Sequence, residues 1–282
     1  MYLGVSTGKN NYSIPGINDQ KHWNKHLAIV IGIEDECNDI PSLSSNQLYS
    51  IIHEVSHFFV SPLIDTTYQN YSSEMEDVFS LIKNEMSPLG YGSARSVTGE
   101  WINEIFTLRY FLATADEHNI DEYIAENEER GLIWFGKSVN ETILNHHDKS
   151  VSEALPRIIQ FAQSLPGRWD AIQAEYFSKK PRIIAMHPSL NEISSETKMI
   201  KVVFSESMIM GMSGMLKLAD YPMIPADFPS CHWENDTTFV IILHPNILTP
   251  GTEYGIRFPY TSFVSKNHYR MKDNYDIHLK VR

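Results

Sequence analysis

The chain has 282 residues, and its 23 lysines and arginines against 35 aspartates and glutamates give a formal net charge of -12 at pH 7. The length favours two domains, and a hydrophobic content of 42% is enough for at least one core. The negative charge argues against a nucleic-acid binder, because such a protein needs a basic surface to neutralise phosphates. The sequence contains no apolar run of about 18 residues, so no transmembrane segment is predicted. Met1–Val5 lacks the basic start and long apolar centre of a signal peptide, so the chain is expected to be cytoplasmic or a trimmed exported precursor.

The first part of the chain is predicted to begin with extended segments and to continue with helices. Leu27–Ile33 is β-branched and apolar, which is typical of a strand. Such a strand is either an edge strand that pairs with extended substrate or an ordinary buried strand. Asn46 to about Val60 is predicted to be a helix that ends at Ser61-Pro62, because apolar residues recur on one stripe at Leu48, Ile52, Val55 and Phe59.

Further helices are predicted over 73–84 and over 98–115, the latter with Thr98 as its N-cap. Residues 120–135 indicate one helix or two shorter ones, and 151–164 and 168–177 are predicted as two helices split by Leu165-Pro166-Gly167. After about residue 180 short apolar or alternating runs, separated by turn residues, are typical of an all-β sandwich. They cover 182–186, 198–204, 215–218, 238–243, 254–258 and 277–281. The predicted domains are therefore 1–180 and 181–282, with Cys37 and Cys231 as two unpaired thiols.

A metal-binding pattern lies in the middle of the helix predicted over 46–60. His53 and His57 are four residues apart, so a helix places both imidazoles on one face, where they can share a zinc ion. Glu54 is placed to act as general base on a zinc-bound water. The alternative interpretation is that two histidines and a glutamate share a solvated helix face.

A catalytic zinc needs a third protein ligand, and no histidine follows His57 at the short spacing of the HExxHxxGxxH pattern. A downstream acidic residue on another helix is a better candidate. Glu100 and Glu104 are one helical turn apart, so both can face the same way. The residues alone leave the choice between them open.

The run His53-Glu54-Val55-Ser56-His57, followed by Asn103-Glu104, resembles the gluzincin metallopeptidases. The resemblance implies an α+β zincin-like catalytic domain, mostly helical with a small N-terminal sheet, and Glu104 as the third zinc ligand. Glu100 is the alternative ligand, and its other role is stabilisation of the first helical turn. The gap between His57 and Glu104 is longer than in the thermolysin-like prototype, and an inserted helix over 73–84 accounts for it. The layout also resembles a poorly characterised bacterial family of secreted HExxH proteins, a domain family of unknown function.

Gluzincins use a tyrosine or histidine to stabilise the oxyanion that forms on the substrate. Tyr91 is the first candidate here, and the others are Tyr110, His118, His146 and His147. Arg109 and Asp116 are candidates for hydrogen-bond partners of a ligand histidine.

Lys198–Met208, with its Phe204-Ser205-Glu206 run, resembles bacterial Ig-like modules, and Leu248–Tyr254 fits the same pattern. This resemblance covers about 181–282 and implies an Ig-like β-sandwich that acts as a spacer or contacts substrate, a polymer or the cell surface. Such modules mostly belong to exported proteins, so we expect an extracellular, periplasmic or cell-surface location. The predicted function is zinc-dependent hydrolysis of peptide bonds in a protein or peptide substrate. The alternatives are a non-catalytic cell-surface binding protein with a structural or vestigial zinc site, and a zinc hydrolase of non-peptide bonds.

Overall fold

The structure of the chain is a computed structural model. It describes residues 2–3, 12–14, 28–31, 45–114, 120–144, 146, 151–189, 193–211, 213–226, 230–244 and 247–282. The chain divides into two compact units, Met1–Ile172 and Gln173–Arg282. The boundary predicted near residue 180 lies further along, between the end of the last helix at Ser178 and the strand that begins at Ile183.

The first unit begins with a three-stranded sheet of β1 (Tyr2–Leu3), β2 (Tyr12–Ile14) and β3 (Ala28–Ile31), in the order β1-β3-β2. Strand β3 pairs in parallel with β1 and antiparallel with β2, so Val30 lies opposite both Tyr2 and Tyr12. Since β3 is the central strand, its backbone groups are occupied on both sides. Of the two alternatives for this strand, the central position of β3 excludes an edge strand that is free to pair with substrate.

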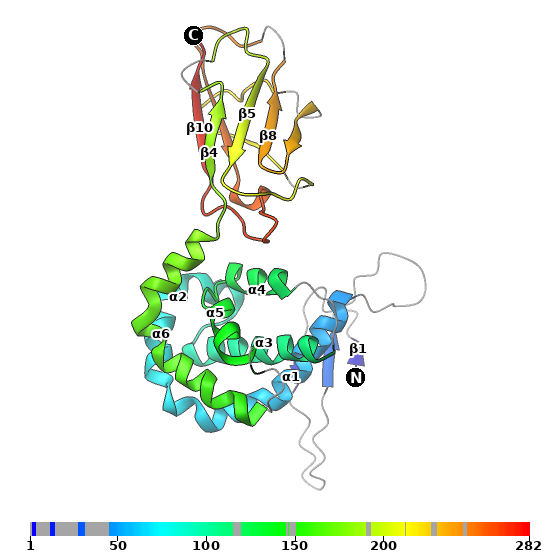
Figure 1. Cartoon of the computed structure of the whole chain (residues 1–282), viewed down its shortest axis with the longest axis vertical. Helices are drawn as coiled ribbons and strands as arrows, with labels where there is room; N and C mark the ends of the chain where they lie inside the picture. The colour runs from blue at the N-terminus through cyan, green and yellow to red at the C-terminus, as the bar shows by residue number, and fades with distance from the viewer. Residues whose placement is uncertain are drawn as a thin grey trace. The chain divides into compact units, whose positions relative to one another are not determined.

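The other described residues of the first unit are mostly helical (Figure 1). Its helices are α1 (Ser45–Thr67), η1 (Tyr68–Asn70), α2 (Ser72–Met86), η2 (Ser87–Leu89), α3 (Ala94–Thr114), α4 (Ile120–Glu129), α5 (Phe135–Val139), the π-helical turn η3 (Asn140–Leu144) and α6 (Val151–Ser178). Helices α1 and α2 both pack against α3. The core contains Trp101 and Trp134, whose rings meet edge to face, and the Trp101 indole donates to Ser138 Oγ at 3.0 Å. Among the described helices, none is long and apolar enough to cross a membrane.

Two of these helices continue through prolines that were expected to end them. Helix α1 runs past Pro62 to Thr67, and α6 runs past Pro166, so that the two helices predicted over 151–164 and 168–177 are one. A proline inside a helix costs about 3 kcal/mol, because it removes one backbone hydrogen bond and crowds the preceding turn. Apolar side chains on both sides of Pro62 are buried, Val60 and Ile64 among them. Burial of such side chains offsets the cost, so packing decides where these helices end.

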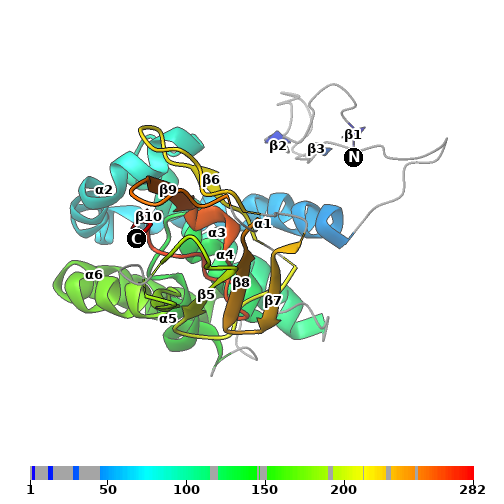
Figure 2. The same cartoon turned by 90° about the horizontal axis from the view of Figure 1, so that it is seen from above.

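The second unit contains two antiparallel sheets, ordered β4-β5-β8-β7 and β10-β9-β6. Figure 2 shows β5, β8 and β7 following one another in the larger sheet. The strands are β4 (Ile183–His187), β5 (Met199–Phe204), β6 (Leu216–Lys217), β7 (His232–Asn235), β8 (Thr238–Ile242), β9 (Glu253–Phe258) and β10 (Tyr275–Lys280). Buried side chains of both sheets, such as Val202 and Ile241 in one and Ile256 and Leu279 in the other, form one core. The side chain of Cys231 is half-buried, and Cys37 lies outside the described residues.

Candidate metal centre

The two histidines of the HExxH pattern lie one turn apart on α1, with their rings edge to face and the ring centroids 4.9 Å apart. Two polar contacts join α1 to α3 close to these histidines. Asn103 Nδ2 donates to the main-chain oxygen of His53 at 3.0 Å, and the hydroxyls of Ser56 and Thr107 are 3.1 Å apart. These two polar contacts fix which turn of α3 faces the histidines.

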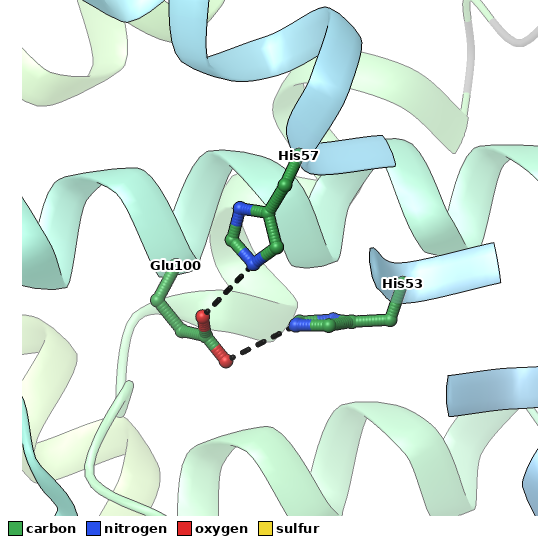
Figure 3. Close-up of side chains that lie close together, drawn as sticks. All are labelled: His53, His57 and Glu100. Atoms are coloured by element: carbon green, nitrogen blue, oxygen red, sulfur yellow. Dashed lines mark ion pairs between the residues drawn. The ribbon is translucent and has the colours of Figure 1, made fainter. Parts of the chain in front are cut away.

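The side chain that α3 places between the two histidines is Glu100 (Figure 3). Its Oε1 is 3.7 Å from His53 Nε2, and its Oε2 is 3.7 Å from His57 Nε2. One ligand atom from each of the three residues lies within 4.8 Å of the others. Two imidazole nitrogens and a carboxylate oxygen therefore converge on one point, which is an arrangement that can hold a metal ion.

Glu104 has a different environment from the one that the gluzincin resemblance implied. Its Oε1 lies 3.4 Å from His53 Nδ1, on the other edge of the ring from the nitrogen that faces Glu100. The Tyr123 hydroxyl donates to Oε2, and Arg130 donates to Oε1 at 3.1 Å. The one-turn offset between the two glutamates thus places Glu100 against both histidines and Glu104 against one. In this structure Glu100 occupies the position that we had expected for Glu104.

Arg130, just after the end of α4, bridges the two glutamates. One nitrogen donates to Glu104 Oε1, and the other is 3.3 Å from Glu100 Oε1. The two carboxylate side chains are only 7% and 2% exposed, and carboxylates this buried need a compensating charge. Arg130 was not among the candidates from the sequence. Its one signal was an arginine followed by Gly131 within the segment 120–135, which is common in proteins of any function.

The carboxylates also shift the proton affinities of the histidines. Burial lowers the pKa of His53, but hydrogen bonding to Glu104 and the charges of Glu104, Glu100 and Glu54 outweigh burial and raise it to about 9. Burial, together with the neighbouring His53, lowers the pKa of His57. A proton on this histidine pair therefore resides on His53. The charge of Glu54 acts on both rings, as expected for a carboxylate beside the cluster.

A pocket of about 550 Å³ opens beside the cluster. It is lined by residues of α1, α3 and the loop between η2 and α3: His57, Ser61, Ile64, Asp65, Gly90, Tyr91, Ser93, Arg95, Ser96, Gly99 and Glu100. Pockets of this size hold small ligands or a substrate side chain. Burial, and then the charge of Glu100 and a hydrogen bond to it, raises the pKa of Tyr91. The Tyr91 hydroxyl is therefore protonated and lies next to the cluster.

The other residues considered from the sequence are not brought to the cluster by any described contact. Tyr110 is 44% exposed on α3, and Arg109 is its neighbour on that helix. His146 is half-buried beyond η3, where its backbone N–H donates to Ile143 O at 2.8 Å. Asp116, His118 and His147 lie outside the described residues.

No protein-family model and no curated protein sequence matches the chain. Among solved structures, the crystal structure of the S-layer protein rSbsC(31-844) is similar at a TM-score of 0.26 and 12% sequence identity, over 84% of this chain. This chain spans about a third of that one, since the match covers 34% of it. The crystal structure of the N-terminal part of the bacterial S-layer protein SbsC is similar at a TM-score of 0.24 and 12% identity, over 86% of this chain and 60% of that one. Similarity at this level carries no argument about the function of this chain.

Proposed function

We propose that this protein is a zinc-dependent hydrolase of peptide bonds. One observation carries the proposal: His53, His57 and Glu100 bring three ligand atoms within 4.8 Å of one another beside a pocket of about 550 Å³. Two histidines and one glutamate are a ligand set of catalytic zinc sites, in which a fourth position stays open for water or substrate. The HExxH pattern and the resemblance to gluzincins support the same function.

The described contacts of His53 fit zinc as the metal. A histidine that binds zinc through one ring nitrogen usually donates its other N–H to a carboxylate, which fixes the orientation of the ring. His53 has this pair of neighbours, since its Nε2 faces Glu100 and its Nδ1 faces Glu104 at 3.4 Å. We therefore propose Glu100 as the third ligand and Glu104 as the residue that orients His53. This assignment departs from the expectation that Glu104 is the ligand.

Bound zinc supplies a Lewis acid that polarises a carbonyl and makes water acidic at neutral pH. In the proposed reaction Glu54 takes the proton from the attacking water and passes it to the leaving amine. The protonated Tyr91 hydroxyl donates to the negative oxygen that develops on the substrate carbonyl. The pocket lined by Ile64, Tyr91 and Gly99 takes a side chain of the substrate.

The experiment that tests the proposal is Glu54→Gln, which keeps the size of the side chain and removes its basicity. We expect this variant to bind one zinc per chain, as the wild type does, and to lose peptide hydrolysis by at least about a hundredfold. The matched control is Glu76→Gln, which neutralises an exposed carboxylate on α2 and should leave both properties unchanged. Full peptidase activity of Glu54→Gln in a zinc-loaded sample would refute the mechanism.

A second candidate function is a binding protein whose zinc site is structural. The observation that favours it is the approach of Glu104 to His53, because a fourth protein ligand would close the site. Cobalt substitution separates the two candidates. A centre with three protein ligands keeps exchangeable water and changes its absorption when a small anion such as azide is added, whereas a closed centre does not.

We further propose that the second unit is a bacterial Ig-like β-sandwich of an extracellular, periplasmic or cell-surface protein. Two antiparallel sheets with a common core, and the Phe204-Ser205-Glu206 pattern, support this interpretation. Its proposed role is contact with the cell surface, a polymer or the substrate. Fractionation of the source cells, followed by detection of the protein with an antibody, tests the location.

A further inference from the structure

The candidate centre brings four protein groups together, although a catalytic zinc uses three. We propose that Arg130 holds Glu104 away from the metal and so keeps one coordination position open. This inference rests on the proposed function, and it assigns to Arg130 a positioning role that the HExxH pattern does not contain.

The described contacts of Glu104 account for both of its carboxylate oxygens. Arg130 and His53 Nδ1 lie at Oε1, and the Tyr123 hydroxyl donates to Oε2. Glu100 differs, because Arg130 lies near its Oε1 while its Oε2 faces His57 Nε2. The same guanidinium therefore restrains Glu104 and leaves Glu100 turned toward the histidines.

Of the two side chains that donate to Glu104, Arg130 is the one that carries a positive charge. The Glu104 side chain is only 2% exposed, so water cannot neutralise it, and its nearest described cation is Arg130. Tyr123 donates a hydrogen bond and carries no positive charge. A buried carboxylate that loses its counter-charge is strongly destabilising unless another nearby cation compensates it. With zinc bound between His53 and Glu100, that cation would be the metal.

The backbone conformation after Arg130 helps to place its side chain beside the two glutamates. Gly131 follows it with a φ of +113°, a conformation that ends the helix and favours glycine. A Cβ at Gly131 would lie 2.8 Å from Met86 Sδ, so the methionine side chain would have to shift to admit it. Arg130 thus lies directly before the turn at the end of the helix. Its two terminal nitrogens contact the carboxylates of Glu104 and Glu100, which are one helical turn apart.

The test measures zinc affinity, by competition with a chromophoric chelator, in the full-length protein. We expect Arg130→Gln to bind zinc at least tenfold more tightly than the wild type, because Glu104 becomes a fourth ligand. A variant that is merely destabilised would bind zinc more weakly, so the direction separates the two explanations. Arg130→Met, which keeps the apolar stem of the side chain, carries the same expectation if Arg130→Gln does not fold.

Removal of Arg130 also removes a positive charge, which by itself strengthens zinc binding, so Glu104→Gln is made in both backgrounds. We expect it to weaken zinc binding about tenfold in the wild type, where Glu104 only orients His53. In the Arg130→Gln background we expect at least a hundredfold loss, since a ligand is removed. Cobalt-loaded Arg130→Gln should also lose the response to azide, and Glu104→Gln should restore it.

The outcomes separate this inference from the proposed function. A wild-type chain that binds zinc, in which Glu104→Gln has the same effect in both backgrounds, contradicts the role of Arg130 and leaves the proposed function standing. Zinc binding by Arg130→Gln that is unchanged or weaker contradicts it as well. A wild-type chain that binds no zinc contradicts both proposals.

Discussion

The two glutamates of α3 offer a direct test of the geometry, because only one of them faces both histidines. Glu100→Gln removes a ligand charge with almost no change in volume. A structural zinc site with four ligands binds with about 10–16 kcal/mol, so one ligand contributes about 2.5–4 kcal/mol on average. The loss of Glu100 should therefore weaken zinc binding by about a hundredfold to a thousandfold.

Glu104→Gln is the matched comparison, since it removes the same group one turn further along α3. Loss of a partner that only orients a ligand histidine lowers metal affinity by about 10–100-fold. Glutamine can still accept a hydrogen bond from His53 Nδ1, so we expect the lower end of that range. The assay is competition with a chromophoric chelator, with helical circular dichroism as the check on folding. If Glu104→Gln loses more affinity than Glu100→Gln, Glu104 is the third ligand and the geometric assignment is refuted.

Two further predictions concern the proton on His53 and the glycines of the helical unit. Because the pKa of His53 is raised to about 9, zinc must displace its proton below that pH, so affinity should rise about tenfold per pH unit up to about pH 9 and then level off. Calorimetry in buffers of different ionisation enthalpy counts the released proton, and a flat affinity between about pH 7 and about pH 9 would contradict the prediction. Gly99→Ala should stabilise the helical unit by about 0.5–1 kcal/mol, because the new Cβ would meet only Ile64 Cδ1 at 4.0 Å in the middle of α3. Gly131→Ala should destabilise the helical unit, because the positive φ of Gly131 and the 2.8 Å approach to Met86 both oppose a side chain. Thermal melting compares the two variants. A melting temperature of Gly99→Ala below that of the wild type would contradict the first of these two expectations.

The helix that carries the histidines could be predicted from sequence, because apolar periodicity and the four-residue spacing are local properties. The end of this helix could not be predicted. Pro62 predicts a helix end, but the helix continues because Val60 and Ile64 are buried, and their burial depends on neighbours that the local sequence does not show. Strand β7 (His232–Asn235) was missed for a related reason, since it is short and mostly exposed and lacks the alternation of its neighbours.

At the candidate site, too, the spacing of residues along one helix could be predicted, whereas contacts between helices could not. The spacing of Glu100 and Glu104 placed both near the two histidines, but their different contacts depend on how α3 is rotated against α1. That rotation is fixed by contacts such as Asn103 Nδ2 to His53 O, which no pattern in either segment encodes. Thr98 was expected to cap α3 and instead lies within it, its hydroxyl donating to Ala94 O at 2.8 Å. Arg130 reaches the site from a third element, so only the tertiary structure reveals it.

The proposed ligands come from two helices that are far apart along the chain, and this has a consequence for how long the protein persists in its surroundings. A metal that bridges α1 and α3 binds the folded helical unit and has no comparable site in the unfolded chain. Free zinc at a hundred times its dissociation constant would add about 2.7 kcal/mol to the stability of that unit. Scarcity of zinc would then do more than abolish the proposed activity. It would shorten the lifetime of the helical unit against heat and proteases, so that the metal supply sets the amount of protein as well as its activity.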